Sequence, residues 1–421
     1  MRRFRWVVLL VIGACSTVPV AERRSDSGKL KPEFRPDSPF GMGIYFGSRY
    51  TPEEMVRAAR LAQRAGIRWN REEISWQYVE PERGQWRWDR YDKALRISRE
   101  HGILSFGLLD YTVPWASSAP PGADRPHLYA PRDLGDFERY AFETVSRYRD
   151  VIKYWEVWNE PNGTGFWLPK PDPAAYTRLL EAARRGIKRA DPDAQVLGLS
   201  LSMFDFEFIE GVFQQGGDQF MDVLSIHPYR KTPEFETRDR MMKLRALMAK
   251  YNVNKPVWIT ETGFHVSWEG VTEEMQAQYL VRIYVLFLAE GIEKIFWYDF
   301  RNDGDDPSNK EAGFGVLRYD LTPKLSYHAY AVMARKLEGL RYEDSLASGP
   351  VEVHRFVTRK GRAPRRVIVA WTTGAETNFE FPMASSKVRV TSLLGEEKDV
   401  TLRGERLTLR LTGSPVYVEP L

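Results

Sequence analysis

The sequence has little cysteine and histidine and no excess of charge of one sign. Cys15 is its only cysteine, so no disulfide can form within the chain. The 61 lysines and arginines nearly balance the 57 aspartates and glutamates, and the two signs are interspersed, which argues against a nucleic-acid-binding protein. The six histidines lack the spacing of metal ligands, and neither a P-loop nor a G-x-S-x-G motif occurs. We therefore expect no catalytic metal and no organic cofactor.

Long hydrophobic runs are also absent, and the apolar stretch nearest the N-terminus covers only residues 6–14. Arg2, Arg3 and Arg5 precede this stretch. It is too short to span a bilayer as a helix, but it fits the apolar region of a secretory signal peptide. The sequence therefore predicts export across a membrane.

The end of this stretch, Ile-Gly-Ala-Cys at residues 12–15, resembles a bacterial lipobox. The resemblance implies a signal peptide over residues 1–14, cleavage before Cys15 and a lipid on its thiol. Ser16 then favours the outer membrane, or a position facing the periplasm. The polar residues 15–38 are expected to form a flexible tether. An uncleaved anchor, or an ordinary signal peptide with an incidental cysteine, is the alternative.

Short apolar runs then alternate with amphipathic segments as far as residue 342. The expected strands span residues 41–47, 67–76, 104–111, 154–161, 195–203, 222–230, 256–264 and 294–300. The helical segments span residues 52–65, 89–100, 136–149, 173–189, 236–251, 273–290 and 325–337. Strands that alternate with helices favour parallel βαβ units, and eight such strands favour a (β/α)₈ TIM barrel. We assign the barrel to residues 39–342.

The pattern changes to period-two alternation in the last part of the chain. Runs such as VEVHRFV, RRVIVAWT and RLTLRL follow one another without a helical segment between them. This pattern predicts a small antiparallel β-sandwich over residues 343–421. We expect it to support the barrel rather than to bind carbohydrate.

Two glutamates lie where catalytic residues of such barrels are found, at the C-terminal ends of strands. Glu160 follows the fourth expected strand in the run WEVWNEPN, and Glu261 ends the seventh in WITETG. Two carboxyl groups across one pocket are what glycosidic cleavage requires, one to donate a proton and one to attack or to activate water. Each glutamate alone is more simply structural, whereas the pair at these two strand ends indicates catalysis.

The motifs Trp-Asn-Glu-Pro and Thr-Glu-Thr-Gly resemble those of clan A of the glycoside hydrolases, retaining enzymes with (β/α)₈ barrels. The resemblance extends in order over residues 41–340 and is greatest to glycoside hydrolase family 39 and its exopolysaccharide-cleaving relatives. It implies a double displacement that cleaves β-type bonds of an oligo- or polysaccharide. Glu160 would be the acid/base and Glu261 the nucleophile.

The same resemblance assigns roles in substrate binding to five further residues. It implies that Arg71 orients the nucleophile, that Asn159 binds the 2-hydroxyl of the sugar, and that Trp297 lies under the sugar in the −1 subsite. His227 and Tyr229 match a His-x-Tyr segment of the clan. A structural role is the alternative for Arg71, His227 and Tyr229.

Other residues and functions remain open. Trp76, Tyr111 and Trp115 follow strand ends, where an aromatic ring can stack on a sugar or simply pack within a loop. Glu156 is expected lower in the barrel, paired with Arg68 or Arg71. The chain is expected to be a monomer. The alternatives to a hydrolase are a non-catalytic carbohydrate-binding or assembly lipoprotein and a transglycosylase that uses the same two carboxylates.

Overall fold

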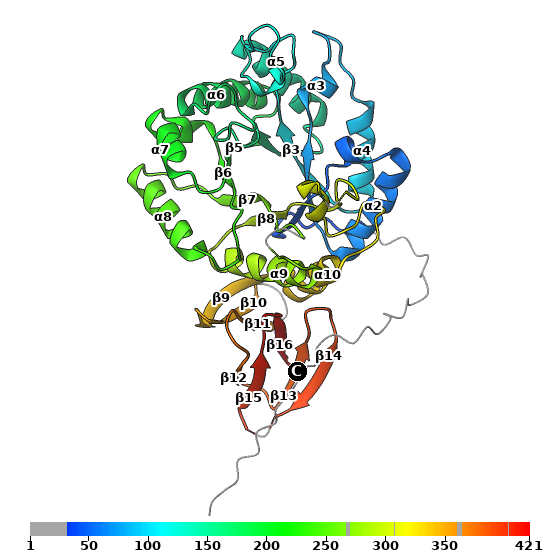
Figure 1. Ribbon diagram of the computed structural model, residues 1–421, viewed down its shortest axis with the longest axis vertical. Coiled ribbons are helices and arrows are strands. Elements are labelled where there is room, and N and C mark those ends of the chain that lie inside the picture. The colour runs from blue at the N-terminus through cyan, green and yellow to red at the C-terminus, as the bar shows by residue number, and fades with distance from the viewer. Residues whose placement is uncertain (1–31, 267–269, 307, 360–363, 403) are drawn as a thin grey trace, which may run out of the picture.

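The computed structural model describes residues 32–266, 270–306, 308–359, 364–402 and 404–421. Eight parallel strands form a closed barrel in which each strand pairs with the next along the chain and β8 pairs with β1. The strands are β1 (Phe40–Gly43), β2 (Trp69–Glu73), β3 (Leu104–Leu109), β4 (Tyr154–Val157), β5 (Gln195–Ser202), β6 (Val223–His227), β7 (Val257–Thr262) and β8 (Lys294–Trp297). All eight lie within or beside the expected segments, which confirms the predicted TIM barrel (Figure 1).

Helices surround the barrel. They are α1 (Phe46–Arg49), α2 (Pro52–Ala65), α3 (Trp76–Val79), α4 (Asp89–Glu100), α5 (Leu134–Tyr148), α6 (Pro173–Ala190), α7 (Phe206–Gln214), α8 (Thr237–Lys250), α9 (Glu273–Ala289) and α10 (Leu325–Leu337). Three short 3₁₀ turns are η1 (Pro126–Leu128), η2 (Gly217–Phe220) and η3 (Lys310–Gly313). Helix α7 was not among the predicted helices, because its opening residues Phe-Glu-Phe alternate like those of a strand.

Helix α2 begins and ends where its local signals predict. The Thr51 side chain accepts a hydrogen bond from the Glu54 amide, and the Glu54 carboxylate accepts one from the Thr51 amide. Pro52 occupies the first turn, where no helical N–H partner is needed. Gly66 ends the helix in a left-handed conformation, with φ of 78°.

The interior of the barrel changes from aromatic to charged along the strands. Trp69, Phe106, Trp258 and Phe296 belong to an apolar cluster in the lower part of the barrel. Arg71 lies two residues after Trp69 in β2, on the same face of the strand, and it pairs in register with Phe106 of β3. The polar residues of the barrel therefore lie above an apolar floor.

The C-terminal region forms two antiparallel sheets, which confirms the predicted β-sandwich. One sheet has the order β14-β13-β16-β11-β10-β9 and the other pairs β12 with β15. The strands are β9 (Leu340–Ala347), β10 (Val351–Thr358), β11 (Arg366–Thr372), β12 (Thr377–Pro382), β13 (Lys387–Thr391), β14 (Glu397–Thr401), β15 (Arg406–Leu411) and β16 (Val416–Pro420). Strand β9 was not predicted, and the expected domain boundary between residues 342 and 343 falls inside it.

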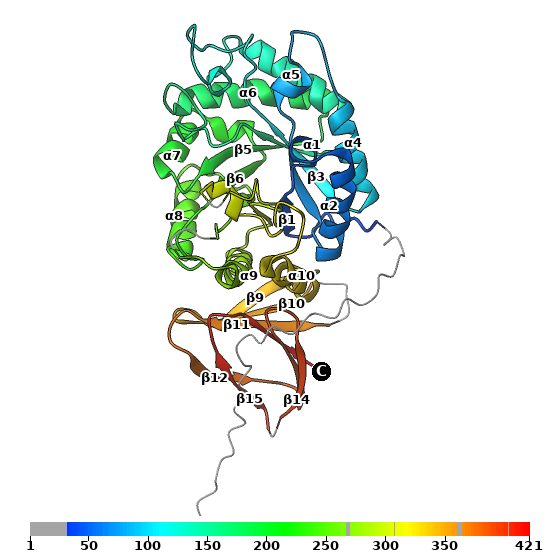
Figure 2. The ribbon, with the colours of Figure 1, turned by 45° about the vertical axis from the view of Figure 1, so that its right-hand side comes forward.

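The larger sheet lies against the barrel beside α9 and α10 (Figures 1 and 2). Trp371 of β11 donates a hydrogen bond from Nε1 to Glu234 Oε1 at 2.9 Å. Arg282 of α9 binds the same carboxylate through two nitrogens. Glu234 lies in the loop between β6 and α8, so the sheet holds a loop of the barrel in place.

The expected tether over residues 15–38 is only partly described. Residues 32–38 contact the barrel rather than extending from it: the buried Ser38 donates a hydrogen bond to Glu338, and Lys294 donates one to the Pro36 carbonyl. Cys15 and the expected signal peptide lie outside the described residues. In the described part of the chain, every helix is too short or too polar to cross a membrane.

Candidate active site

A cavity of about 580 Å³ opens at the C-terminal ends of the barrel strands. Its volume lies within the range of roughly 300–1,000 Å³ that is usual for small-molecule sites. The predicted site residues that line it are Arg71, Tyr111, Asn159, Glu160, Tyr229 and Glu261. Residues from β2 and β7 and from the segments after β3, β4 and β6 thus meet at one cavity, as the barrel topology predicts.

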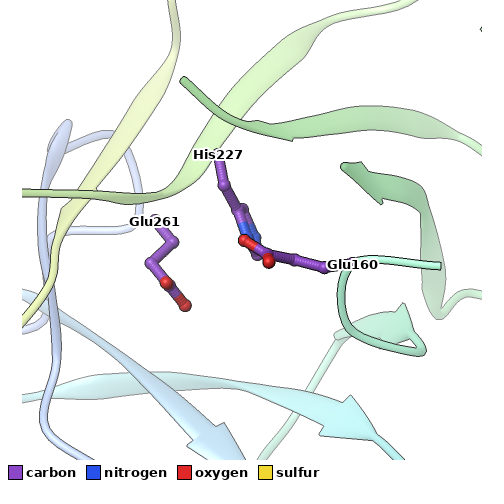
Figure 3. Close-up of side chains that lie close together, drawn as sticks. All are labelled: Glu160, His227 and Glu261. Atoms are coloured by element: carbon purple, nitrogen blue, oxygen red, sulfur yellow. The ribbon is translucent and has the colours of Figure 1, made fainter. Parts of the chain in front are cut away.

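Glu160 and Glu261 approach each other across this cavity. A carboxylate oxygen of each and a ring nitrogen of His227 all lie within 4.8 Å of one another (Figure 3). In retaining glycosidases the two carboxyl groups stand about 5–5.5 Å apart, whereas inverting enzymes leave about 6.5–9.5 Å for a water molecule. The separation therefore fits direct attack by one carboxylate.

The turn after β4 positions Glu160. Trp158 and Glu160 both have left-handed backbone conformations, with φ of 65° and 48°, which are unfavourable for residues other than glycine. The Glu160 amide donates a hydrogen bond to the Ser200 carbonyl at 2.9 Å. The Glu160 carboxyl group lies 3.0 Å from Nδ1 of the buried His227. The strained turn thus directs the carboxyl group into the cavity.

Three side chains hold Glu261. Arg71 Nη1 donates a hydrogen bond to Oε2 at 2.7 Å, and the Tyr229 hydroxyl donates one to Oε1 at 2.5 Å. The Tyr45 hydroxyl lies 3.5 Å from Oε2. A guanidinium and two hydroxyl groups thus fix the position of the carboxylate at the cavity.

Arg71 connects the two sides of the site. Besides Glu261, its guanidinium donates hydrogen bonds to Glu156 at 2.8 Å and to Asn159 Oδ1 at 2.9 Å. Arg71 is 1% exposed. Burial acts to lower its pKa, but Glu156, Tyr45 and Glu261 together outweigh that effect, and the pKa lies well above its ordinary value. Glu156 was expected to pair with Arg68 or Arg71, and the structure shows that it pairs with Arg71.

A bulge in β5 adds a residue that the sequence analysis missed. The β5–β6 register shifts between Leu199 and Leu201, and Ser200 between them has a φ of 48°. Its hydroxyl lies 3.2 Å from His227 Nε2 and accepts a hydrogen bond from Arg71 at 3.4 Å. A bulge changes the direction of a side chain without any composition signal, so this contact was not predictable.

Tyr45 was missed for a similar reason. It lies after β1 in a left-handed conformation with φ of 57°, and Arg71 Nη1 donates a hydrogen bond to its hydroxyl at 3.0 Å. Burial raises its pKa, so the hydroxyl stays protonated and can donate. A tyrosine near a strand end was a visible signal, but the conformation that directs it to Glu261 was not.

Three of the four predicted aromatic platforms lie elsewhere. Trp297 is fully buried, and its indole donates to the Phe314 carbonyl at 3.3 Å, while Tyr298 lines the cavity. Successive residues at a strand end point to opposite sides, so the expected platform is wrong by one position. Trp76 is buried and stacked on Tyr140.

Trp115 also packs within the protein. It contacts Trp76 edge-on, with ring centroids 5.5 Å apart, and its indole donates to the Glu80 carbonyl at 3.3 Å. Neither Trp76 nor Trp115 is among the residues that line the cavity. Tyr111 does line it.

Glu160, His227 and Glu261 are also the group of potential metal ligands found in the described part of the chain. His227, however, already uses both ring nitrogens: Nδ1 faces Glu160, and Nε2 lies 3.2 Å from Ser200 and 3.1 Å from Thr260. Its ring is held for a role beside Glu160, and a metal ion would have to displace that carboxyl group from Nδ1.

Comparison with known families identifies the same region. The family model of glycosyl hydrolases family 39 matches residues 137–374, more than half of the 421-residue chain, and both carboxylates lie in this stretch. A β-xylosidase of Geobacillus stearothermophilus is 25% identical over 238 residues, which cover 49% of this chain and 45% of the relative. An endo-1,4-β-xylanase A of Phanerodontia chrysosporium is 26% identical over 129 residues, or 30% of its length. The chain thus aligns with less than half the length of these curated relatives.

Solved structures show the same architecture over nearly the whole chain. A family 39 glycoside hydrolase from Bacteroides cellulosilyticus is similar with a TM-score of 0.79 and 27% identity, over 93% of this chain and 83% of that one. A family 39 β-xylosidase from Caulobacter crescentus, at 19% identity, matches with a TM-score of 0.66 over 93% of this chain and 98% of its own. The second similarity concerns the fold alone.

Proposed function

Because the chain belongs to glycosyl hydrolases family 39, we propose that it is a retaining glycosidase that cleaves β-type bonds of an oligo- or polysaccharide. The observation that carries the proposal is the approach of Glu160 and Glu261 to within 4.8 Å across one cavity. Both carboxylates come from one barrel, which supports action as a monomer.

In the first step Glu261 attacks the anomeric carbon and forms an ester bond with it. The bond from that carbon to the leaving oxygen breaks, and Glu160 gives this oxygen its proton. Arg71 and Tyr229 hold the attacking carboxylate in place, since they bind one oxygen each. Asn159, fixed through its carbonyl by Arg71, is placed to bind the sugar beside the reacting carbon.

In the second step Glu160, now ionised, takes a proton from a water molecule. The water attacks the same carbon from the side of the departed group, and the bond to Glu261 breaks. Two inversions at one carbon give net retention. His227 lies against Glu160 and orients it in both steps.

The proposal is tested with the purified protein and a panel of aryl β-glycosides, β-xylosides included, together with plant and bacterial polysaccharides. We expect turnover of at least one of these substrates, and proton NMR should show the β-anomer as the first sugar released. Release of the α-anomer would contradict the double displacement. If no substrate is cut while a polysaccharide still binds, the non-catalytic alternative replaces this proposal.

A transglycosylase would use the same residues but pass the sugar to another sugar instead of to water. The assay distinguishes it, because the transfer product grows with the concentration of added acceptor. The complete carboxylate pair with its Arg71 and Tyr229 contacts argues against a binding scaffold, since a scaffold does not need a carboxylate held in position for attack.

We also propose that the protein is lipid-anchored in a bacterial envelope, in the outer membrane or facing the periplasm. The support is the sequence of residues 1–16, with its basic start, apolar run and Cys15. A single acyl signal binds a membrane only weakly, whereas several chains anchor stably. In cells grown with labelled palmitate, the protein should carry the label and sediment with membranes. Cys15→Ser should lose the label, and a label that persists would contradict the anchor at this residue.

A further inference from the structure

Two more carboxyl groups line the catalytic cavity and take no part in the double displacement. Glu73 ends β2, and Asp110 directly follows the last residue of β3. Glu73 pairs in register with Leu108, and Asp110, two residues beyond Leu108, points to the same side of its strand. We call Glu73 and Asp110 the side pair.

Asp110 is buried without satisfying its oxygens. It is 1% exposed, and its Oδ1 accepts no hydrogen bond from any of the described residues. A buried, unpartnered polar atom costs free energy, and its persistence is explained when a ligand supplies the partner. Because the carboxyl group borders the cavity, a bound molecule can supply that hydrogen bond.

The cations of the cavity are committed to other carboxylates. Arg71 pairs with Glu156 and Glu261, and Arg49 pairs with Asp299 and with Asp303. Over the described ranges, no lysine, arginine or histidine forms an ion pair with either member of the side pair. Burial, together with the charge of Glu73, raises the pKa of Asp110 well above its ordinary value. Asp110 Oδ1 thus remains a free acceptor at the edge of the cavity.

The side pair lines the same cavity as Asn159, which is expected to bind the 2-hydroxyl, and Tyr111, which directly follows Asp110. We propose that the side pair selects the sugar: it accepts hydrogen bonds from hydroxyl or ammonium groups beyond C2 and rejects a sugar that carries a carboxylate there. This inference rests on the proposed function and names the substrate class of that site.

The selectivity has a direct physical basis. A site built to accept hydrogen bonds from a ligand loses those bonds and gains like-charge repulsion when the ligand brings a carboxylate. We therefore expect the purified protein to cleave a neutral or amino aryl β-glycoside at least roughly 100-fold more efficiently, in kcat/KM, than the matching β-uronide.

Asp110→Asn and Glu73→Gln test the pair. Each should lower kcat/KM for the preferred glycoside by roughly 10- to 100-fold, the usual effect of a lost hydrogen bond to a charged acceptor. Each should also reduce the ratio of kcat/KM for the preferred glycoside to kcat/KM for the matching uronide. Asp110→Asn should leave the melting temperature unchanged or raise it, because it removes a buried acid without a partner. A merely structural aspartate would instead destabilise the protein when replaced.

Glu311→Gln is the matched control, because it removes one negative charge from the same cavity without changing the side pair. A glucosaminide added to the panel separates the two kinds of donor. If the side pair recognises the ammonium group, the glucosaminide has the highest kcat/KM, and this value falls the most in both variants. If hydroxyls are recognised, the neutral sugar is preferred.

Binding measurements separate this inference from the proposed function. Calorimetry with Glu261→Gln and methyl β-glycosides needs no turnover, so side-pair selectivity is measurable even in a protein that cleaves nothing. In that case the proposed function falls and the inference stands. The inference is overturned if the uronide binds or reacts as well as the neutral sugar, or if the two variants change the preference no more than Glu311→Gln does.

Discussion

Glu261→Gln is expected to abolish turnover, with kcat for an aryl β-glycoside reduced by roughly 10⁴-fold or more, as when a covalent nucleophile is removed. The amide cannot form the ester with the anomeric carbon. The shape of the side chain and one acceptor for Arg71 and Tyr229 persist, so the protein should remain folded. Initial rates and a thermal melt of the same preparation provide the two readouts.

Glu160→Ala provides the complementary result. Loss of a general acid costs roughly 10²–10⁴-fold, and mainly for leaving groups that need a proton. An activated dinitrophenyl glycoside should therefore still form the ester. Added azide should then release a β-glycosyl azide from Glu160→Ala and an α-glycosyl azide from Glu261→Gly. If Glu261→Gln keeps activity within tenfold of the wild type, Glu261 is not the nucleophile.

Arg71→Met is expected to have the largest effect on stability and a large one on activity. Its removal leaves Glu156 buried beside no cation, and breaking a buried pair from one side costs about 3–5 kcal/mol in the free energy of unfolding. Glu261 loses its cation at the same time, and removal of one such electrostatic contact lowers kcat by roughly 100-fold or more. Denaturant unfolding and steady-state kinetics measure the two losses.

A second change separates these two effects. Glu156→Gln added to Arg71→Met removes the unpaired charge, so stability should recover while activity does not. Arg71→Lys keeps the charge but not the planar set of donors that reaches Glu156, Glu261 and Asn159, and should be intermediate in both measurements. An unfolding free energy for Arg71→Met equal to that of the wild type would show that Glu156 does not depend on this ion pair.

Local signals made the helix ends predictable. Helices α2, α4 and α10 have the bounds that the sequence predicts, because capping residues, glycine and apolar periodicity act over a few residues. Strand β9 lacks such a signal: its residues Leu340–Ala347 include five charged or polar side chains, and it is a strand because it pairs with β10.

The two carboxylates were predictable because both lie at strand ends of a barrel whose topology the alternation predicts. The contacts that give Glu160 and Glu261 different surroundings were not predictable. Tyr45 and Ser200 reach the site through left-handed backbone and a bulge, which tertiary packing imposes. Trp297 was predicted to lie under the sugar but is fully buried, because a shift of one residue at a strand end turns the side chain to the other side of the strand.

The contact between the C-terminal sheet and the loop after Tyr229 couples the stability of the sheet to that of the barrel. Glu234 in that loop accepts a hydrogen bond from Trp371 and is bound by Arg282, and Glu352 of β10 pairs with Arg238 at the start of α8. Tyr229, which holds Glu261, begins the same connection. The sheet never touches the sugar, yet its folding free energy contributes to the order of the nucleophile. Transfer of this barrel to another partner domain would therefore remove these contacts from the loop that begins at Tyr229.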